Sequence, residues 1–273
     1  MSDSKTASLH RIDQLPIDAS AEIFRHYPAF KFGVTAAVRH YAQLLLPLVQ
    51  RLIAESKQAG WIITGPGLAS QTPAAANLLC WELFDLCNAN ELSLIDLEYD
   101  NEATASIDYA KLDLADRLTQ RERLARRLIP NTEFRGRPVL FINDICITGV
   151  QQHTMQQYFD RVEAACVTWL YVIVVDPEVG KAKPEIEWEI NFAPFEDLLR
   201  MVSREEIQFT GKCVLKLMEL KVEELDRVLR ALSSERRARL LELAARNFEH
   251  LDGFKKKLEL LRTYAPDNAE GVG

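Results

Sequence analysis

The sequence has no long hydrophobic run. Its longest apolar stretch, Leu170–Val175, falls far short of the roughly 20 residues that a membrane-spanning helix needs. The polar N-terminal segment MSDSKTASLHRIDQLPIDAS also lacks the apolar core of a secretory signal. We therefore expect a cytoplasmic protein that does not associate with membranes.

Cysteine and histidine are scarce and scattered. The chain has five cysteines, an odd number without a CxxC pair, and its five histidines form no cluster with metal-ligand spacing. The cysteines lie among apolar neighbours, which favours reduced thiols in or near the core over a disulfide framework. A structural zinc site is therefore not expected.

Two common phosphate-binding motifs are missing, because the sequence contains neither GxxxxGKS/T nor GxGxxG. A P-loop and a Rossmann dinucleotide site are thus not indicated. The net charge of −7 argues against an extended nucleic-acid-binding surface, although it leaves room for a local basic patch. The basic runs at Lys255–Lys257 and Arg236–Arg239 are interleaved with glutamates, which is typical of a solvated helix face.

What the sequence does contain is an alternation of short apolar segments with amphipathic ones. Apolar residues recur at helical spacing from Val34 to Ser56, whereas Trp61–Thr64 and Val167–Val175 are rich in β-branched and aromatic residues. Strands separated by helices predict right-handed crossovers and a mostly parallel sheet flanked by helices, an α/β fold. The predicted strands are 61–64, 92–97, 139–142 and 167–175, and the predicted helices are 34–56, 74–88 and 149–164. Residues 111–129 are expected to form either a charged helix or a mobile loop.

The pattern divides the chain into three regions. Residues 1–26 are polar and are expected to form a loosely held N-terminal arm, and residues 27–197 form the α/β domain. Residues 198–273 are rich in helix formers with leucines at helical spacing, and Ser233 is suited to cap a helix start. They predict a C-terminal α-helical domain of two or three helices, whose role is left open among a dimerisation element, a cap on the site and a docking module.

Two predicted strands run into unusual loops, Thr64–Gly67 and Asn143–Val150. Ligands of open parallel sheets bind at the carboxyl ends of the strands. In the second loop, Gly149 lets the backbone approach a ligand, and the amides that open the next helix form an anion pocket to which Thr148 adds a hydroxyl. Asp144 precedes this pocket and is placed to accept hydrogen bonds from sugar hydroxyls. The alternative is that the same residues form only a turn or a helix cap.

The stretch Val139–Gly149, VLFINDICITG, resembles the phosphoribosyl-pyrophosphate (PRPP) signature of type I phosphoribosyltransferases. That signature is a run of apolar residues, two acidic residues and a short loop ending in Thr-Gly or Ala-Gly. Upstream, WIITGPGLASQTP at 61–73 is similar to the strand and loop that receive pyrophosphate in that family. The segment at 118–127 resembles competence-associated phosphoribosyltransferase-like proteins, and YPAFKFG at 27–33 resembles a further branch of the superfamily. The resemblance spans residues 27–195.

The resemblance implies a site built from three segments. Asp144 would hold the ribose hydroxyls as the catalytic residue and would bind Mg²⁺, the implied cofactor. Arg121, with Arg117 or Arg123 as alternatives, would supply a catalytic cation from a loop that closes over the substrate. The residues implied for the ribose and the 5-phosphate are Asn143, Asp144, Ile145, Cys146, Ile147, Thr148, Gly149 and Val150. The residues implied for pyrophosphate are Thr64, Gly65, Pro66 and Gly67.

The sequence departs from the family pattern at several of these positions. Asn143 replaces the first acidic residue, which removes a charge but keeps an acceptor for a hydroxyl. Val150 and Gln151 stand where the family usually offers a hydroxyl, and Ile147 stands where some members carry a carboxylate or a threonine. These departures bear on catalysis more than on the fold.

Three functions remain open. The leading hypothesis is transfer of a phosphoribosyl group from PRPP to an unidentified acceptor, with release of pyrophosphate. The alternatives are a catalytically weak PRPP- or nucleotide-binding regulator that acts through its helical domain, and a scaffold without a ligand. The expected partner is a small molecule, PRPP or a nucleotide; nucleic acid is not favoured, and homo-oligomerisation is left open.

One further segment is relevant to the acceptor. In this family a variable hood covers the base, and Trp188 or Phe192 could contribute to it. Trp188 alternates with acidic residues in EIEWEI at 185–190, a pattern that predicts an edge strand with one solvated face.

Overall fold

The computed structural model describes residues 5–17, 21–56, 58–68, 72–87, 92–100, 114–204 and 206–264. Its centre is a five-stranded sheet in the order β1-β5-β4-β2-β3. Every pairing within it is parallel. The strands are β1 (Lys5–Ile12), β2 (Trp61–Thr64), β3 (Leu92–Leu94), β4 (Pro138–Cys146) and β5 (Cys166–Val175). The predicted α/β fold with a parallel sheet is therefore confirmed.

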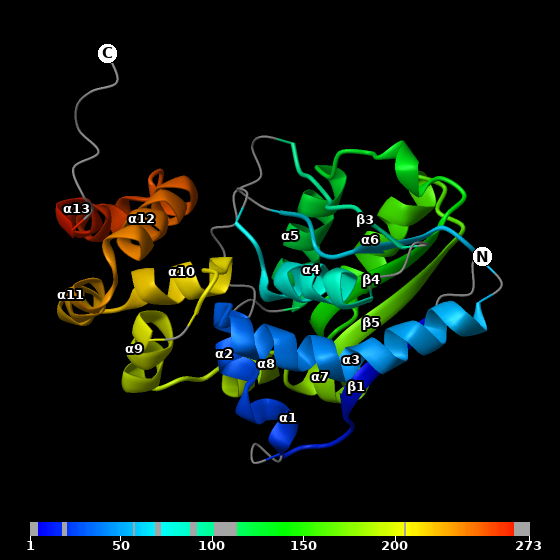
Figure 1. Ribbon diagram of the computed structural model, residues 1–273, viewed down its shortest axis with the longest axis horizontal. Coiled ribbons are helices and arrows are strands. Elements are labelled where there is room, and N and C mark those ends of the chain that lie inside the picture. The colour runs from blue at the N-terminus through cyan, green and yellow to red at the C-terminus, as the bar shows by residue number, and fades with distance from the viewer. Residues whose placement is uncertain are drawn as a thin grey trace.

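Helices cover both faces of the sheet (Figure 1). On one face, α3 (Thr35–Glu55) and α4 (Ala75–Cys87) pack their apolar sides onto Ile63, Leu140 and Leu170. On the other face, α6 (Val150–Arg161) packs onto Phe141 and Trp169, and α5 (Leu114–Arg126) lies beside α6. The two central strands are buried on both faces, which explains their nearly continuous runs of β-branched and aromatic residues.

The N-terminal segment differs from the expected loose arm. Residues Lys5–Ile12 form an edge strand that pairs with Thr168–Val175 of β5, and Ile12 is buried in the core. The segment is polar because only part of it faces the core, and an edge strand carries polar side chains readily. Two short helices, α1 (Glu22–Arg25) and α2 (Tyr27–Phe32), follow and lead into α3.

Two further predictions need correction. The strand predicted at 139–142 continues through Asn143 and Asp144 to Cys146, because β5 offers it backbone partners along this whole length. The segment around Trp188 is not an edge strand but a short helix, α8 (Ile186–Ile190), which follows α7 (Pro177–Ala182). Helical geometry puts Ile186 and Ile190 on one buried face, an arrangement that the period-two pattern of acids concealed.

The C-terminal region is helical as predicted, with more helices than the two or three expected. It comprises α9 (Phe195–Arg204), α10 (Gly211–Glu219), α11 (Val222–Ala231), α12 (Ser234–Phe248) and α13 (Lys255–Tyr264). The Ser233 side chain caps α12 by accepting a hydrogen bond from the amide of Arg236. Figure 1 shows these helices gathered at one end of the molecule, beyond α2.

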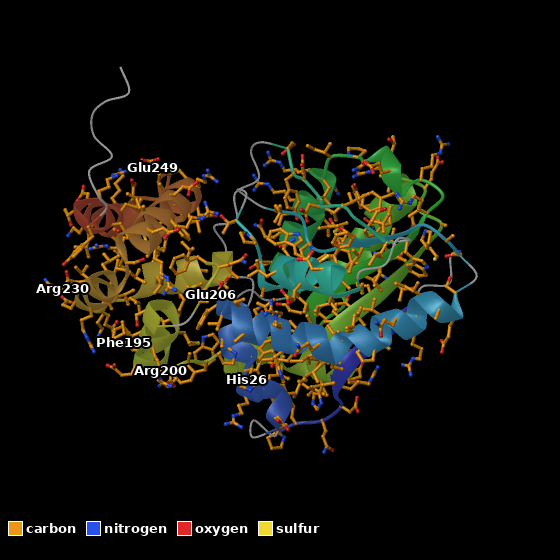
Figure 2. All side chains as sticks on the ribbon, in the orientation of Figure 1. His26, Phe195, Arg200, Glu206, Arg230 and Glu249 are labelled. Atoms are coloured by element: carbon orange, nitrogen blue, oxygen red, sulfur yellow. The ribbon has the colours of Figure 1, made fainter. Side chains whose placement is uncertain are left out.

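The helical region joins the sheet domain at α2. The carbonyl of Glu206 accepts a hydrogen bond of 2.9 Å from the amide of Thr35, and Figure 2 shows Glu206 at this junction. A Cβ on Gly33, whose φ is +89°, would lie 2.0 Å from the carbonyl oxygen of Gln208. Glycine is therefore required where α2 meets this segment. No helix among the described residues is long and apolar enough to cross a membrane.

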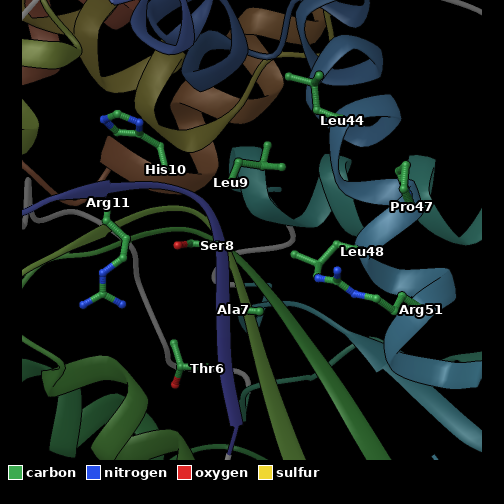
Figure 3. A pocket seen from close by; sticks show the side chains of 10 residues that line it. All are labelled: Thr6, Ala7, Ser8, Leu9, His10, Arg11, Leu44, Pro47, Leu48 and Arg51. Atoms are coloured by element: carbon green, nitrogen blue, oxygen red, sulfur yellow. The ribbon is translucent and has the colours of Figure 1, made fainter. Parts of the chain in front are cut away.

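A groove runs along the sheet edge, between β1 and the exposed side of α3 (Figure 3). It encloses about 650 Å³ and is lined by Thr6–Arg11 together with Leu44, Pro47, Leu48 and Arg51. None of the residues from Asn143 to Val150 lines it, so this groove is separate from the predicted ligand loop.

Candidate functional site

Strands β2 and β4 pair in parallel, with Thr64, the last residue of β2, opposite Phe141, so both strands point to the same edge of the sheet, where β4 continues further, to Cys146. The two loops predicted from the sequence therefore start at the same edge of the sheet. Thr64 is fully buried, and its hydroxyl has no hydrogen-bond partner among the described residues. An unpaired buried hydroxyl costs free energy unless a ligand or water pairs with it.

The loop after β2 is packed against its surroundings. The carbonyl oxygen of Pro66 accepts a hydrogen bond of 2.6 Å from the side-chain amide of Asn77 in α4. A Cβ on Gly67 would lie 2.6 Å from the ring of Tyr99, so glycine is required there by close packing. The site role predicted for Thr64, Gly65, Pro66 and Gly67 stays a prediction, and residues 69–71 of this loop lie outside the described residues.

The turn between β4 and α6 has the geometry of an anion site. Gly149 adopts a φ of +71° as the N-cap residue of α6, and a Cβ added there would meet nothing within 4 Å. No described side chain caps the first turn of α6, so its amides keep their donors for another partner. Thr148, half-buried, precedes Gly149. Free amides at the positive end of a 12-residue helix, beside a hydroxyl and open space, suit a phosphate.

The loop between Cys146 and Gly149 packs against α7. A Cβ on Gly180 of α7 would lie 2.1 Å from the carbonyl oxygen of Ile147, so α7 contacts the loop backbone directly. Burial raises the pKa of the Cys146 thiol, whose sulfur lies 3.8 Å from Oε1 of Gln152. The loop is therefore fixed by its close contact with α7.

Asn143 and Asp144 do not form a pair. Asn143 donates a hydrogen bond of 3.1 Å to Gln151 of α6, on one face of the sheet. Asp144 points to the opposite face, toward α2, as alternation along a strand requires. The two side chains implied to hold the ribose together thus diverge. Only Asp144 lies on the side of α2 and α8.

The partner of Asp144 is Lys31, which the sequence analysis did not identify as a site residue. The ammonium of Lys31 forms an ion pair with Asp144 and a second one, 2.8 Å long, with Glu187 of α8. Lys31 is a buried residue, and the side chains of Asp144 and Glu187 are also largely covered. A signal was present in the sequence, since a lysine between Phe30 and Phe32 is forced toward the core and needs an acidic partner.

The two carboxylates control the charge state of the groups around them. Burial lowers the pKa of Lys31, but the attraction of Asp144 and Glu187 outweighs it, so the pKa lies above its ordinary value. Burial raises the pKa of Tyr27 well above its ordinary value, and the same two carboxylates add to that shift. At neutral pH the cluster therefore contains an ammonium and a neutral phenol.

Two buried polar atoms of this cluster are unpaired. The hydroxyl of Tyr27, a residue with no exposed surface, has no hydrogen-bond partner among the described residues. The same holds for Oδ1 of Asn191, whose Nδ2 donates a hydrogen bond of 3.3 Å to Glu187. A donor and an acceptor are thus left over beside the ion pairs.

Helix α8 and the residues directly after it also present two exposed aromatic side chains. Trp188 and Phe192 are 47% and 59% exposed, and their ring centroids lie 6.2 Å apart. Each follows directly after Glu187 or Asn191 in the sequence, so the aromatic pair comes from the same short segment as these two polar residues. Exposed rings of this kind are suited to stack on a planar ligand group.

The predicted arginines come from α5, which lies beside α6. Arg123 is exposed in the second half of that helix. The side chains of Arg117 and Arg121 lie outside the described residues, so the catalytic role of Arg121 stays a prediction.

The residues present do not fit a magnesium ion at Asp144. Mg²⁺ binds through oxygen ligands in octahedral geometry, whereas an ammonium already lies against this carboxylate and Asn143 faces away from it. Among the described residues, no group of three or more His, Cys, Asp or Glu is arranged to hold a metal ion. A cation added beside Lys31 would also be repelled by it.

No protein-family model matches the chain, and no curated protein matches it significantly. Among solved structures, it is similar to a hypoxanthine phosphoribosyltransferase from Staphylococcus aureus, with 11% identity and a TM-score of 0.33 over 52% of this chain and 65% of that one. A hypoxanthine-guanine phosphoribosyltransferase from Bacillus anthracis has 10% identity and a TM-score of 0.35, over 52% and 70% of the two chains.

A variant of the Trypanosoma cruzi hypoxanthine phosphoribosyltransferase, complexed with its product IMP, has 11% identity and a TM-score of 0.31 over 53% and 79%. These structures are phosphoribosyltransferases; they are not described as competence-associated, and that subtype stays a prediction.

Proposed function

We propose that this protein is a phosphoribosyltransferase that transfers the phosphoribosyl group of PRPP to an unidentified acceptor and releases pyrophosphate. The observation that carries the proposal is the uncapped start of α6 at Gly149, with open space in front of it, at the same strand end as Asp144. A ribose 5-phosphate needs this combination of an anion site and a nearby carboxylate. A cytoplasmic location and a small-molecule partner belong to the same proposal.

Each group has a defined role in this reaction. The amide of Val150 and the hydroxyl of Thr148 bind the 5-phosphate, and Asp144 accepts hydrogen bonds from the ribose hydroxyls. The acceptor displaces pyrophosphate from the anomeric carbon through a transition state with oxocarbenium character. The protein positions the reacting groups and stabilises the departing anion, for which Arg121 and the loop from Thr64 to Gly67 are the proposed residues.

Calorimetric titration with PRPP tests the proposal. We expect binding by the native protein and at least a tenfold loss of affinity in Asp144→Asn, a substitution that keeps the size of the side chain and removes its charge. The control is Asp85→Asn, at an exposed aspartate of α4. Release of pyrophosphate is then measured with purines, pyrimidines and amines as acceptors. Failure to bind PRPP, or equal affinity in Asp144→Asn, contradicts the proposal.

A second candidate is a regulator that binds PRPP or a nucleotide without turnover. It is favoured by the contact between the helical region and the loop after β2, where the amide of Gly211 donates a hydrogen bond of 2.9 Å to the carbonyl of Pro73. Ligand bound at this edge could then act on the helical region. Binding of PRPP without pyrophosphate release from any acceptor, together with altered amide exchange in α10 and α12, would favour the regulator.

A further inference from the structure

The buried charge cluster under the sheet edge consists of one ammonium and two carboxylates from three distant segments. Lys31 comes from α2, Asp144 from β4 and Glu187 from α8, and Lys31 is 113 and 156 residues away from its two partners. One ammonium and two carboxylates give the cluster a formal charge of −1. Two carboxylates buried together repel each other strongly, so the cluster needs a cation between them.

The backbone of Lys31 is fixed, so this side chain does not reach the carboxylates by chance. Its carbonyl accepts a hydrogen bond of 2.7 Å from the hydroxyl of Thr210, which is itself fully buried. Phe30 and Phe32 on either side are core residues. The position of the ammonium beside Asp144 is therefore fixed by the packing of α2. The residues around a metal ion fix its ligands in the same way.

The unpaired atoms around the cluster point to a hydroxylated ligand. The Tyr27 hydroxyl is a donor and Oδ1 of Asn191 is an acceptor, both buried and both without a partner among the described residues. A pair of ribose hydroxyls offers donors and acceptors that can satisfy both, together with Asp144. The charges of the cluster are thus paired by Lys31, whereas the Tyr27 hydroxyl and Oδ1 of Asn191 remain available to a ligand.

We propose that the ammonium of Lys31 is the resident cation of this site, filling the place at Asp144 and Glu187 that a divalent cation would take, so that a ribose phosphate binds here without a divalent metal. The part that concerns the ribose phosphate rests on the proposed function, whereas the part that concerns Lys31 does not.

The decisive test measures thermal unfolding with MnCl₂ or MgCl₂ alone, in the native protein and in two variants. Lys31→Ala removes the ammonium and leaves a space between two carboxylates, which we expect to bind the metal. A metal concentration about one hundred times the dissociation constant should then raise the melting temperature of this variant by about 5–10 °C. Lys31→Met fills the space with an uncharged chain of similar length, and it should respond no more than the native protein, which we expect to show no shift.

A shift in the native protein equal to that of Lys31→Ala overturns the proposal. Absence of a shift in folded Lys31→Ala overturns it as well. If Lys31→Ala folds only when metal is present, that rescue supports the proposal. If Lys31→Ala folds in neither condition, the double variant Lys31→Ala with Glu187→Gln is measured instead, because it has one buried charge fewer. A metal-dependent rise in its melting temperature supports the proposal, and no rise overturns it.

A second experiment separates this inference from the proposed function. Affinity for PRPP and for AMP is measured by calorimetry in EDTA and in MgCl₂. We expect native affinities to agree within about twofold between the two conditions, and those of Lys31→Ala to rise at least tenfold with MgCl₂. A native affinity that needs Mg²⁺ overturns the inference while leaving the transferase proposal intact. If neither ligand binds, the proposed function fails, and the metal titration still decides the role of Lys31.

Discussion

The side-chain amide of Asn247 in α12 donates a hydrogen bond of 2.9 Å to the hydroxyl of Thr72, in the segment between β2 and α4. Both residues are buried, so this bond lies inside the contact between the helical region and the sheet domain. The same amide also donates to the carbonyl of Leu243, which fixes the side chain within α12. The helical region is thus attached to the very segment that the sequence predicts to receive pyrophosphate.

Asn247→Ala should lower the free energy of unfolding by about 1–3 kcal/mol, because it removes two buried hydrogen bonds, to Thr72 and to Leu243. Denaturant unfolding followed by circular dichroism measures the loss, and Glu259→Ala, at an exposed position of α13, serves as the control. We also expect a single transition. Separate unfolding of the helical region would contradict the coupling between the two parts.

Gly149 provides a test of the phosphate loop with a matched control elsewhere. Gly149 and Gly136 have φ values of +71° and +68°, and a Cβ on either would meet nothing within 4 Å. Substitution by alanine should therefore cost each the same 1–2 kcal/mol or so of left-handed strain. Only Gly149→Ala should also weaken binding of PRPP, by about tenfold, because its Cβ enters the space in front of the α6 amides. Equal ligand affinity in the two variants would show that phosphate does not bind at this turn.

The parts of the site that the sequence revealed are those close together along the chain. Asp144, Thr148 and Gly149 lie within six residues, and their order alone predicts a strand, a turn and a helix start. Lys31 and Glu187 escape this reasoning because Lys31 is distant in sequence from both Asp144 and Glu187 and is brought to them only by the fold.

For secondary structure too, the sequence predicts long segments better than short ones. The long amphipathic segment at 34–56 was predicted almost to the residue, because helical periodicity accumulates over many turns. Short segments carry too few periods to decide: EIEWEI alternates like a strand but forms α8, and the polar stretch Lys5–Ile12 acquires its strand conformation from pairing with β5.

Because the hydroxyl of Tyr27 is unpaired, we expect its removal to affect ligand affinity but not the stability of the fold. Tyr27→Phe removes a buried hydroxyl without a partner, so stability should be unchanged or higher by about 1 kcal/mol. If this hydroxyl serves the ligand, affinity for PRPP should fall at the same time. Tyr41→Phe is the control, because the hydroxyl of Tyr41 donates to the carbonyl of Ile23 and its removal should cost about 1 kcal/mol. A loss of stability in Tyr27→Phe as large as in Tyr41→Phe would argue for a structural role.

Trp188 tests whether α8 contributes to base recognition. Its side chain is 47% exposed, so Trp188→Ala should change stability by no more than about 0.5 kcal/mol. A stacked base would lose about 1–3 kcal/mol of binding free energy, a decrease in AMP affinity of roughly tenfold or more. Calorimetry with ribose 5-phosphate, which has no base, should show no difference between variant and native protein. Leu44→Ala, at a similarly exposed apolar residue of α3, controls for loss of surface area.

The edge strand β1 decides whether the N-terminal segment is part of the folded sheet domain. Ile12, at its end, is only 4% exposed, and its carbonyl accepts a hydrogen bond of 2.8 Å from the amide of Asp176. Ile12→Ala should therefore lower the free energy of unfolding by about 2–4 kcal/mol, through lost burial and the cavity left behind. Leu15→Ala, three residues further along at a side chain that is 41% exposed, should cost less than about 0.5 kcal/mol. Equal and small losses in both variants would mean that β1 contributes nothing to the core, and that the segment is the loose arm its polar sequence predicts.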